Sequence, residues 1–515
     1  MTENTSLLLT LVRGIQNASL LRISAAVVGL AIAQYFFQAI YRLYFHPLRH
    51  FPGPKLAAIS RFPKAYATFT GRAHHYTHAL HEQYGEVVRL SPNELSFIHP
   101  DAWRDIYGHG SGQGKGTQGS VPGKYWEWYG LCSNKVAHMI QTKDPAEHAR
   151  IRRIFKPAFS DRALKEQEPL LLKYVEKLIS NLKRDVSKDP DHKFDIVKQY
   201  NFTTFDVMGD LTFGESLHML DDSKYDPWVA VIFNQLKQNS LFNFMAYYPW
   251  INSLVKNNLP PSVLKVKMEH FRYSVERVDK RLQGRQSEGH DLWDFISTED
   301  KKLQLSRDEM NSNATLFMTA GTETTATFLS GLTYNLLKNP DKMEKVCKEI
   351  RTTFRDESEM TMEAIAALPY LAACLKESFR VYPSVPSGLL HLTPANGSTI
   401  CGQFIPPNTI VSAPHLAMYL SPSNFKEPQS FLPERWMGDE RFANDRRHVL
   451  QPFSVGSRDC LGKNLAWHEM RLIATRVLFN FDLELCPESD GWLDQRTFLL
   501  WEKPEMYIKL KPVKR

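Results

Sequence analysis

The chain has 515 residues, 43% of them hydrophobic and 12% aromatic, which is enough to bury a large core. The net charge of +7 is mild, and no long basic stretch interleaved with aromatic residues occurs, so we expect no nucleic-acid partner. The six cysteines include no C-x-x-C pair, which argues against a disulfide scaffold or a zinc site and suits a reducing compartment.

One stretch near the N-terminus, Ile23 to Tyr41, can span a bilayer. It has no charged residue, and a helix of about nineteen residues matches the hydrocarbon thickness. Basic residues are more frequent after it than before it, so the positive-inside rule places the rest of the chain in the cytosol. A cleaved signal peptide is the alternative, although its apolar region is normally shorter and closer to Met1. We expect a short lumenal N-terminus (1–22), a transmembrane anchor (23–41), a Pro/Gly hinge (42–60) and a folded body (61–515).

The body shows helical hydrophobic periodicity along most of its length. The predicted helices are roughly 145–185, 194–213, 226–240, 262–283, 306–337, 340–356 and 369–381. The predicted strands are two between Val87 and Ile98, a hairpin between Ser398 and Val411 that turns at Gly402-Gln403, and a last strand at Met506–Leu510. No internal repeat occurs, so we expect one large, mainly α domain with small β-sheets, in the α+β class.

Two connections have an unusual composition. The stretch from Gly108 to Gly123 is rich in glycine and predicts a long loop. The stretch from Leu241 to Ile251 is unusually apolar, and three interpretations of it stay open: contact with a membrane surface, a substrate entrance, or packing in the core. The aromatic residues between Trp126 and Ile140 either line a pocket or pack against the core.

The predicted helix 306–337 carries Ala320-Gly-Thr-Glu-Thr-Thr325 in its middle. Glycine and threonine weaken a helix interior, so we expect a local kink with freed backbone groups at this point. A groove formed by such a kink would place the Glu323 carboxylate and the Thr324 hydroxyl where they can pass protons. The alternative is a surface helix that is rich in threonine.

A carboxylate and a guanidinium stand three residues apart in Glu377-Ser-Phe-Arg380, on one face of the predicted helix 369–381. Alone this spacing is a weak signal, because E-x-x-R occurs by chance about once in a chain of this length. The segment Pro433-Glu-Arg435-Trp follows it and adds a second arginine. The meaning of the pair therefore depends on the segments on either side of it.

Near the C-terminus stands Phe453-Ser-Val-Gly-Ser-Arg-Asp-Cys-Leu-Gly462, which has the form F-x-x-G-x-R-x-C-x-G. A chance match in a chain this long is roughly one in ten thousand. Cys460 would supply a thiolate to a haem iron, and the two glycines would let the backbone pass close to a flat macrocycle. Arg458 would hold an anionic group such as a haem propionate. The alternative is that Cys460 is an ordinary buried thiol.

Together these segments resemble the cytochrome P-450 superfamily, whose A-G-x-D/E-T, E-x-x-R, P-E-R-F/W and cysteine-loop motifs occur here in the family's order, over roughly residues 45–512. The resemblance implies the cytochrome P-450 fold, a single large haem-binding domain after the transmembrane helix. It implies haem b, with Cys460 as axial ligand and with Phe453, Gly456, Arg458 and Gly462 around it. It also implies a catalytic pair, Glu323 and Thr324, and a structural brace of Glu377, Arg380 and Arg435.

Two positions depart from the family pattern. Many members carry W-x-x-x-R early in the chain, and here His148 stands in place of the tryptophan, four residues before Arg152. Many also carry an arginine where this chain has His391. The resemblance implies that His148, Arg152 and His391 contact the haem propionates, since imidazole can donate a hydrogen bond to a carboxylate. For each histidine the alternative is an ordinary polar surface role.

The resemblance implies a single-pass haem-thiolate monooxygenase of the endoplasmic reticulum membrane, with residues 61–515 as its cytosolic catalytic domain. One atom of O2 would enter a lipophilic small-molecule substrate. The chain has no G-x-G-x-x-G after a predicted strand, so it lacks a flavin or nicotinamide module of its own. Electrons would come from an NADPH-dependent cytochrome reductase, and a cytochrome b-type protein is a second potential donor.

The segments YGEVVRLSPNELSF, EHARIRRIFKPAFS and FLPERW look most like members from filamentous fungi that tailor secondary metabolites. This likeness implies a terpenoid, polyketide or alkaloid substrate. Two other functions stay open. A haem-thiolate isomerase or dehydratase would act without a reductase, but such members often lose the threonine that stands here as Thr324. A non-enzymatic haem sensor or carrier would need neither Glu323 nor Thr324.

Overall fold

The structure is a computed structural model, and it describes residues 22–108, 121–129, 135–226, 228–229, 248, 253–254, 261–284, 290–296 and 304–514. Between residues 261 and 270 it describes the side chains of Met268 and Glu269 only. Several predictions lie outside the described residues. They are the lumenal N-terminus, nearly all of the helix at 226–240, nearly all of the apolar connection at 241–251, and most of the glycine-rich loop.

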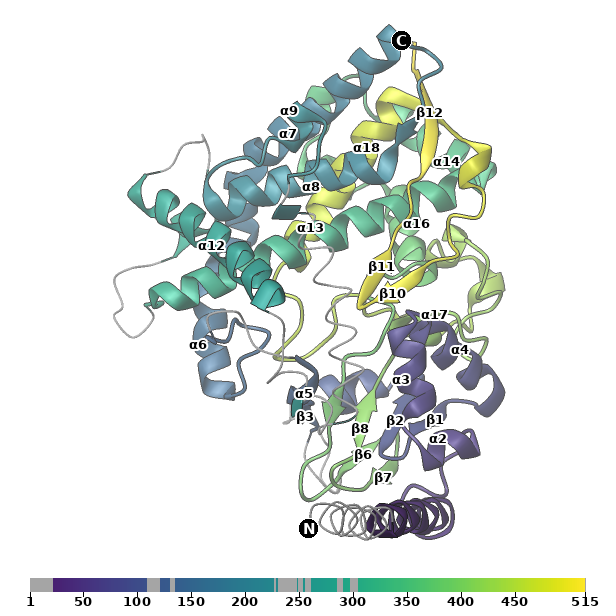
Figure 1. The fold of residues 1–515 in the computed structure, drawn as a ribbon. Coiled ribbons are helices and arrows are strands. Elements are labelled where there is room, and N and C mark those ends of the chain that lie inside the picture. The colour runs from purple at the N-terminus through teal and green to yellow at the C-terminus, as the bar shows by residue number, and fades with distance from the viewer. Residues whose placement is uncertain are drawn as a thin grey trace, which may run out of the picture.

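The body has a helical half and a β-rich half (Figure 1). The helical half surrounds the long helix α13 (Arg307–Leu337), and the β-rich half lies beside the N-terminal helix. A large cluster of buried hydrophobic residues, Phe205 and Leu332 among them, fills the helical half, and a smaller one that includes Phe97 and Val411 lies against the sheet. The predicted mainly α fold with small sheets is therefore confirmed.

The N-terminal helix, Arg22–Phe45, is long and apolar enough to cross a membrane by length and composition, with a mean hydropathy of 1.7 over its most apolar window. None of that window is buried against the rest of the protein. The last turn of the helix, η1 (Tyr41–Phe45), is π-helical. The helix extends beyond the predicted anchor by about one turn, because Arg42 to Phe45 continue it.

The segment predicted as a hinge lies along the first strand. The backbone N–H of Arg89 donates to Pro52 O at 2.7 Å, and the guanidinium of Arg89 donates to Arg42 O at 3.1 Å. The guanidinium of Arg42 in turn donates to Ile59 O. Gly53 is needed here because its φ is +157° and a Cβ would lie 2.6 Å from Arg89 O. These contacts fasten both ends of the segment to the body.

The long helices follow the predicted ranges closely, with one division. The helix predicted over 145–185 is interrupted by the 3₁₀ turn η4 (Lys156–Phe159), which contains Pro157. Ser160 then starts a new helix, because its hydroxyl accepts a hydrogen bond from the Ala163 N–H. The helices besides α13 are α2 (Lys55–Ile59), α3 (Phe62–Phe69), α4 (Ala73–Tyr84), α5 (Trp126–Tyr129), α6 (Pro145–Phe155), α7 (Asp161–Lys188), α8 (Ile196–Phe213), α9 (Met219–Asp222), α12 (Pro261–Gln283), α14 (Pro340–Thr353), α15 (Met362–Ala366), α16 (Pro369–Val381), α17 (His415–Tyr419) and α18 (Lys463–Asn480).

Helix α13 begins at a capping box formed by Ser306 and Glu309 and remains α-helical to Leu337. The helix assignment is uninterrupted at Gly321, and the kink expected there stays a prediction. Gly321 has a packing role. A Cβ at this position would lie 2.7 Å from the sulfur of Met208, so the glycine lets α8 pack closely against α13.

The sheets are small (Figure 1). A five-stranded sheet has the order β1 (Val87–Ser91), β2 (Glu94–Phe97), β8 (Ile410–Ser412), β5 (His391–Leu392) and β3 (Gly123–Lys124). A three-stranded sheet has the order β4 (Phe194–Asp195), β12 (Tyr507–Pro512) and β9 (Phe481–Leu485). Two hairpins complete the set, β6 (Ser398–Ile400) with β7 (Gln403–Ile405), and β10 (Arg496–Phe498) with β11 (Leu500–Glu502). Strands β1, β2 and β8 lie at the end of the molecule near the N-terminal helix, whereas β12 lies at the opposite end, near the C-terminus (Figure 1).

The predicted hairpin that starts at Ser398 is present, but it ends at Ile405, because Ile410 and Val411 belong to β8 of the five-stranded sheet. Its turn also lies one residue earlier than expected. Cys401 and Gly402 form the turn with φ of +48° and +76°. Two positive φ values in a two-residue loop define a type I′ turn, whose twist matches the flanking strands. The β10–β11 hairpin also has a positive φ, +78°, at its single-residue tip, Leu499. This tip is half-exposed.

Candidate active site

The cysteine loop runs directly into the N-terminus of α18, whose first residue is Lys463. The Cys460 side chain is exposed, yet burial raises the pKa of its thiol. Both observations fit a side chain that lines an accessible internal space. The Gly462 N–H and the charges of Arg152 and Lys463 favour the thiolate, and a metal cation at the sulfur would deprotonate it outright.

The two glycines of the loop differ. Gly456 has a φ of +86°, and a Cβ there would lie 1.9 Å from Tyr107 O, so only glycine fits. This turn brings the Cys460 N–H to Phe453 O at 2.9 Å. Gly462 has an ordinary φ of −82° and is the N-cap of α18. The atom nearest to a Cβ added at Gly462 would be a ring carbon of Phe159, at 3.8 Å. Protein atoms alone therefore require glycine at the first position and not at the second.

The structure brings Glu377, Arg380 and Arg435 together, with all three side chains fully buried. Glu377 Oε1 accepts hydrogen bonds from Arg380 Nη2 at 2.8 Å, Arg435 Nε at 3.0 Å and the Leu432 N–H at 2.8 Å. Its Oε2 accepts from Arg380 Nε at 2.9 Å and Trp436 Nε1 at 2.8 Å. Burial raises the pKa of Glu377, but the two arginines and these hydrogen bonds outweigh it, so the pKa lies below its usual value.

This buried group is connected to the cysteine loop through an aromatic contact. Phe379 lies on α16 between the residues of the Glu377–Arg380 pair, and its ring centroid is 5.4 Å from that of Phe453 in an edge-to-face arrangement. Trp467 of α18 contacts both rings, at 5.3 Å and 5.8 Å. Arg380 also donates to three backbone carbonyl groups, which holds the chain around α16 in place. They are those of Tyr419, Pro428 and Ser430.

Glu323 and Thr324 lie on α13 with different surroundings. The Glu323 carboxylate is buried and forms an ion pair with Lys503, and its Oε2 has no hydrogen-bond partner. Burial raises the pKa of Glu323, and Lys503 and Thr327 oppose that shift only in part. Thr324 Oγ1 is exposed and donates to Ala320 O at 2.7 Å. Because Ala320 is exposed too, one face of this otherwise buried helix borders an accessible space.

A further buried carboxyl, Glu469, lies on α18 and was not predicted as a site residue. It accepts a hydrogen bond from Thr325 of α13, the neighbour of Thr324, while its Oε1 has no partner. Burial raises its pKa to about 8, which Thr325 only partly opposes. Glu469 therefore connects the helix that follows Cys460 to the helix that carries Thr324.

A cluster of basic groups gathers near the cysteine loop. Arg458 has one buried donor, Nη1, without a partner, and its other Nη donates to Thr142 O at 3.0 Å. Lys124 on β3 lies directly opposite His391 on β5 in the sheet. Burial and then Arg458 lower the pKa of Lys124 to about 7. Half-buried cations without a carboxylate among their perturbing groups form a site that suits an anionic ligand.

The histidines that depart from the family pattern belong to the same cluster. Burial, followed by nearby Arg458, Arg152 and Lys124, lowers the pKa of His148 to about 4. His391 is also lowered to about 4, chiefly by burial, and its Nδ1 lies 3.0 Å from Pro122 O. Arg152 is engaged with the cysteine loop itself, since it donates to Asp459 O at 2.7 Å and forms an ion pair with the Asp459 carboxylate.

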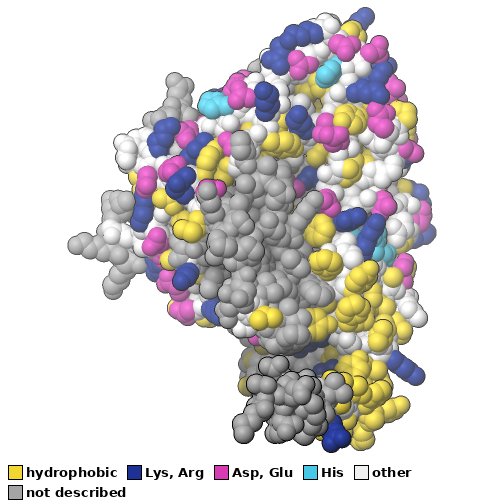
Figure 2. Space-filling view, in the orientation of Figure 1, with side chains coloured by type: hydrophobic (Ala, Val, Ile, Leu, Met, Phe, Trp, Pro, Cys, Tyr) yellow, Lys and Arg dark blue, Asp and Glu magenta, His cyan; other side chains and the backbone are white. Residues whose placement is uncertain are grey.

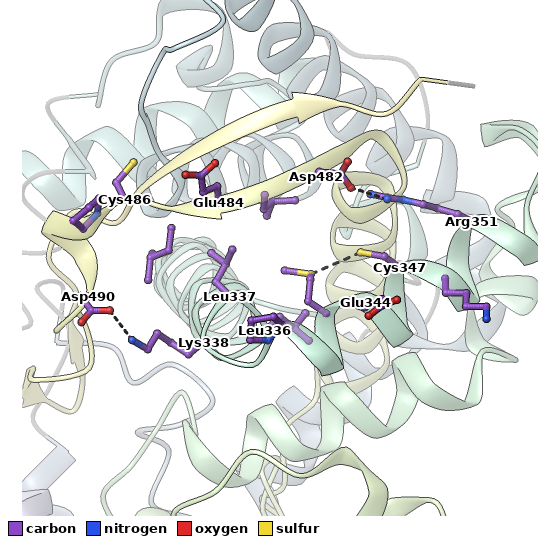
Figure 3. Close-up of a pocket in the computed structure, with 16 residues that line it drawn as sticks. Leu336, Leu337, Lys338, Glu344, Cys347, Arg351, Asp482, Glu484, Cys486 and Asp490 are labelled. Carbon is purple, nitrogen blue, oxygen red and sulfur yellow. Dashed lines mark hydrogen bonds and ion pairs between the residues drawn. The ribbon is translucent and has the colours of Figure 1, made fainter.

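A pocket of about 800 Å³ lies elsewhere, between the end of α13, the start of α14 and strand β9 (Figure 3). Leu336, Cys347 and Leu485 contribute to its apolar lining, and the ion pairs Lys338–Asp490 and Arg351–Asp482 lie on it. None of the predicted site residues lines it. The pocket is therefore separate from the candidate active site.

The structure is mainly helical, and its cysteine loop presents the exposed Cys460 just before α18. The chain belongs to the cytochrome P450 family, since the family model Cytochrome P450 matches residues 52–510. It is therefore an oxidoreductase of the monooxygenase type, and the predicted family is confirmed.

Among its relatives are three fungal proteins. The chain is 42% identical to cytochrome P450 monooxygenase FUM2 of Gibberella moniliformis, over 92% of this chain and 100% of that protein. It is 45% identical to cytochrome P450 monooxygenase efuB of Hormonema carpetanum, over 95% and 97%. It is 42% identical to cytochrome P450 monooxygenase astA of Talaromyces wortmannii, over 94% and 97%. The likeness extends over nearly the whole length of each protein.

The family generally carries haem with a cysteine thiolate, and the residues present fit that group. Cys460 is an accessible thiol at the start of a helix, and the unpaired donor of Arg458 lies in a half-buried basic cluster. Haem b has one iron atom, which a thiolate can bind. It also has two propionate carboxylates, which a basic cluster can bind. Cys460 would hold the iron, and Arg458, Lys124 and the two histidines would hold the carboxylates.

Sequence patterns missed Lys124, Lys503 and Glu469. Lys124 stands beside an aromatic run, Tyr125 to Tyr129, but only the pairing of β3 with β5 reveals its position beside His391. Lys503 is separated from Glu323 by 180 positions. Glu469 stands on α18, a helix outside the predicted ranges, and a carboxylate normally faces solvent. No pattern of neighbouring residues in the sequence predicts the contacts of these three residues.

Proposed function

We propose that the protein is a membrane-bound haem-thiolate monooxygenase that oxidises a lipophilic secondary metabolite with O2 and with electrons from an NADPH-dependent reductase. The observation that carries the proposal is the accessible Cys460 at the N-terminus of α18, beside a half-buried basic cluster. When bound, haem supplies the iron at which O2 is reduced. The brace of Glu377, Arg380 and Arg435 holds the polypeptide around that loop.

The proposed role of Glu323 and Thr324 on the side of the site where O2 would bind, here called the oxygen side, is supported by the exposed face of α13. Thr324 Oγ1 can donate a hydrogen bond to a ligand if it releases Ala320 O, its present acceptor. Glu323 can take up and release a proton at Oε2, the oxygen without a partner. Ala320 lies one turn before Thr324 and lines the same face, which leaves room for a small ligand there.

A lipophilic substrate is supported by the composition of the accessible surfaces. Phe317 of α13 packs in the core against Phe155 at 4.8 Å, while Ala320 and the hairpin tip Leu499 are accessible. Val385 and Leu389 are half-buried. An apolar lining with few polar groups is the general condition of a site for lipophilic ligands. We infer a terpenoid, polyketide or alkaloid substrate from the likeness to fungal relatives.

Attachment to the endoplasmic reticulum membrane is supported by the helix Arg22–Phe45 and by its surroundings. Figure 2 shows hydrophobic side chains gathered on the lower part of the molecule, where the N-terminal helix, α2 and α3 lie. The exposed apolar residues of α2 and α3 are Leu56, Phe62, Tyr66 and Phe69. Such a patch suits contact with a lipid surface. The catalytic domain would then face the cytosol, where the reductase supplies electrons.

Turnover tests the proposal and separates it from a reductase-independent isomerase or dehydratase. We expect microsomes that carry the protein and a reductase to consume NADPH and O2 only when a substrate from a metabolite extract is present. The ferrous carbonyl complex should show the red-shifted Soret band of a thiolate ligand, and Cys460→Ser should abolish it. Product formation without NADPH or O2 would favour the isomerase, and a Soret band unchanged in Cys460→Ser would contradict the assignment of the ligand.

A further inference from the structure

A buried lysine from the C-terminal end of the chain holds the acid of α13. The Lys503 ammonium group forms an ion pair with Glu323 Oε1 and donates to Thr327 Oγ1 at 2.7 Å. The side chains of Lys503 and Glu323 are 3% and 4% exposed, so the pair is shielded from solvent. Thr327 stands one turn after Glu323, and the ammonium therefore bridges two consecutive turns of α13.

The position of Lys503 is fixed by the hairpin that precedes it. Trp501 in β11 stacks on the ring of Tyr382 at 4.7 Å, and its indole N–H donates to Pro383 O at 2.7 Å. On the other strand, Thr497 Oγ1 lies 2.9 Å from His74 Nδ1. The hairpin is thus held on both strands, while its tip, Leu499, is half-exposed. A lysine that directly follows such a strand has little freedom to leave its partner.

The carboxylate is held at one oxygen only. Lys503 occupies Oε1, and Oε2 is buried without a hydrogen-bond partner. The other titratable groups that face Glu323 are two tyrosines, Tyr382 at the end of α16 and Tyr225 beyond α9. Burial is the largest cause that raises the pKa of both; the charge of Glu323 follows it for Tyr382, while for Tyr225 Asp195 contributes before Glu323, so both stay protonated at neutral pH. Lys503 is therefore the only charged partner of Glu323 among the described groups that perturb it.

We propose that Lys503 is a positioning residue for the monooxygenase reaction: it keeps Glu323 ionised and fixes Oε1, so that proton exchange with the oxygen side occurs at Oε2. This inference rests on the proposed function. Loss of the ammonium group leaves a buried carboxylate without a counter-ion, and such a group neutralises by binding a proton. A Glu323 that holds its proton more tightly releases it more slowly to reduced oxygen. A larger share of the O2 then leaves as hydrogen peroxide, with two electrons from NADPH and two protons from solvent, and not in the product.

The test uses the haem-loaded, full-length protein with Lys503→Met, which keeps the length of the side chain and removes its charge. The infrared band of the protonated Glu323 carboxyl, assigned by its loss in Glu323→Gln, is followed through a pH titration. We expect the midpoint to rise by about one pH unit or more. The fraction of NADPH electrons recovered in product should fall about tenfold, with a matching rise in peroxide.

Two further variants serve as controls. Lys503→Arg keeps the positive charge and should restore both readouts in large part. Lys509→Met removes a lysine from the same C-terminal region whose exposed partner is Asp191, and it should change neither. A titration midpoint of Glu323 unchanged in Lys503→Met would overturn the proposal, as would a shifted midpoint with unchanged coupling. Failure of the proposed function shows differently, as a wild-type protein that consumes no NADPH with any substrate.

Discussion

The two sides of the candidate site each contain a buried carboxylate, and the two groups have opposite environments. Glu377, on the cysteine side, accepts five hydrogen bonds from two arginines, a tryptophan and a backbone N–H, and its pKa is lowered. Glu323, on the oxygen side, has one cation and one unpaired oxygen, and its pKa is raised. Burial is similar in both, so the number of donors decides the direction of the shift.

Glu469 extends this comparison to a carboxyl without any cation. Among the groups that the structure describes, the Thr325 hydroxyl alone favours its ionised form, and its pKa is raised to about 8. The series from Glu377 through Glu323 to Glu469 follows a decreasing number of positive partners. A carboxylate such as Glu377, whose oxygens all accept hydrogen bonds and whose pKa is lowered, stays ionised at neutral pH and has a structural role. A carboxylate with fewer donors holds a proton more readily; Glu323 lies on α13, and Glu469 accepts a hydrogen bond from Thr325 of the same helix.

The largest effect is expected from a substitution on the cysteine side, where Glu377 would lose an arginine. Arg380→Ala would leave Glu377 with fewer donors and three carbonyl groups without theirs, at a cost of about 3–5 kcal/mol. We expect haem-free protein and not a slow enzyme, measured by haem content and circular dichroism. The matched control is Arg441→Ala, which removes an exposed partner of Asp439 and should change neither. A folded, haem-replete but slow Arg380→Ala enzyme would contradict the bracing role.

The next largest effect is the pH dependence that Glu469 contributes. A carboxyl whose pKa is raised in the folded state binds its proton more tightly there than in the unfolded state. Its contribution to stability is therefore complete below the unfolded pKa of 4.5 and is lost as the pH rises through about 8. We expect Glu469→Gln to remove this slope and to be more stable than wild type at pH 8, by on the order of 3 kcal/mol.

Urea unfolding at pH 5 and pH 8, followed by circular dichroism, measures this difference. Glu484→Gln is the control, because Glu484 is an exposed residue of β9 beside Lys511. The control should keep the slope of the wild type. Equal slopes in wild type and Glu469→Gln would show that the carboxyl titrates alike in both states.

A smaller effect is expected at the hydroxyl next to Glu323. Thr324→Ala should bind haem and fold normally, because Thr324 Oγ1 bonds only to a carbonyl of its own helix. We expect coupling of NADPH to product to fall about tenfold, with peroxide in place of product. The measurement is the ratio of product to NADPH consumed, with peroxide assayed in parallel. Unchanged coupling would count against the assigned role.

The smallest change in stability is expected when the oxygen-side ion pair is replaced as a unit. The double variant Glu323→Gln/Lys503→Met leaves no unpaired charge, and buried ion pairs are often replaceable at little net cost. We expect its unfolding free energy to lie within about 1 kcal/mol of wild type, measured by urea unfolding, although coupling is lost. Destabilisation of several kcal/mol would instead give this pair a structural role like that of Glu377.

Much of the fold could be predicted from the sequence because its signals are local. Ser306 with Glu309 marks the start of α13, and the cysteine loop fixes its own turn within ten residues. Gly321 shows the limit of local reasoning. A glycine in a helix predicts a weak point, but here its cause is Met208, more than a hundred residues away. Lys124, Lys503 and Glu469 were missed for the same reason, since their partners are brought to them only by tertiary packing.

The contacts between the segment after the N-terminal helix and strand β1 have a consequence for encounters in a membrane. With Arg89 bonded to Pro52 and to Arg42, the body cannot swivel freely about its anchor. In the proposed membrane-bound enzyme, one orientation is then presented to the plane of the bilayer. A partner that diffuses in the same plane would meet a surface that already faces the right way, which raises the effective concentration of productive encounters. Restricting the motion of the body relative to its anchor would thus raise the rate at which the reductase delivers electrons.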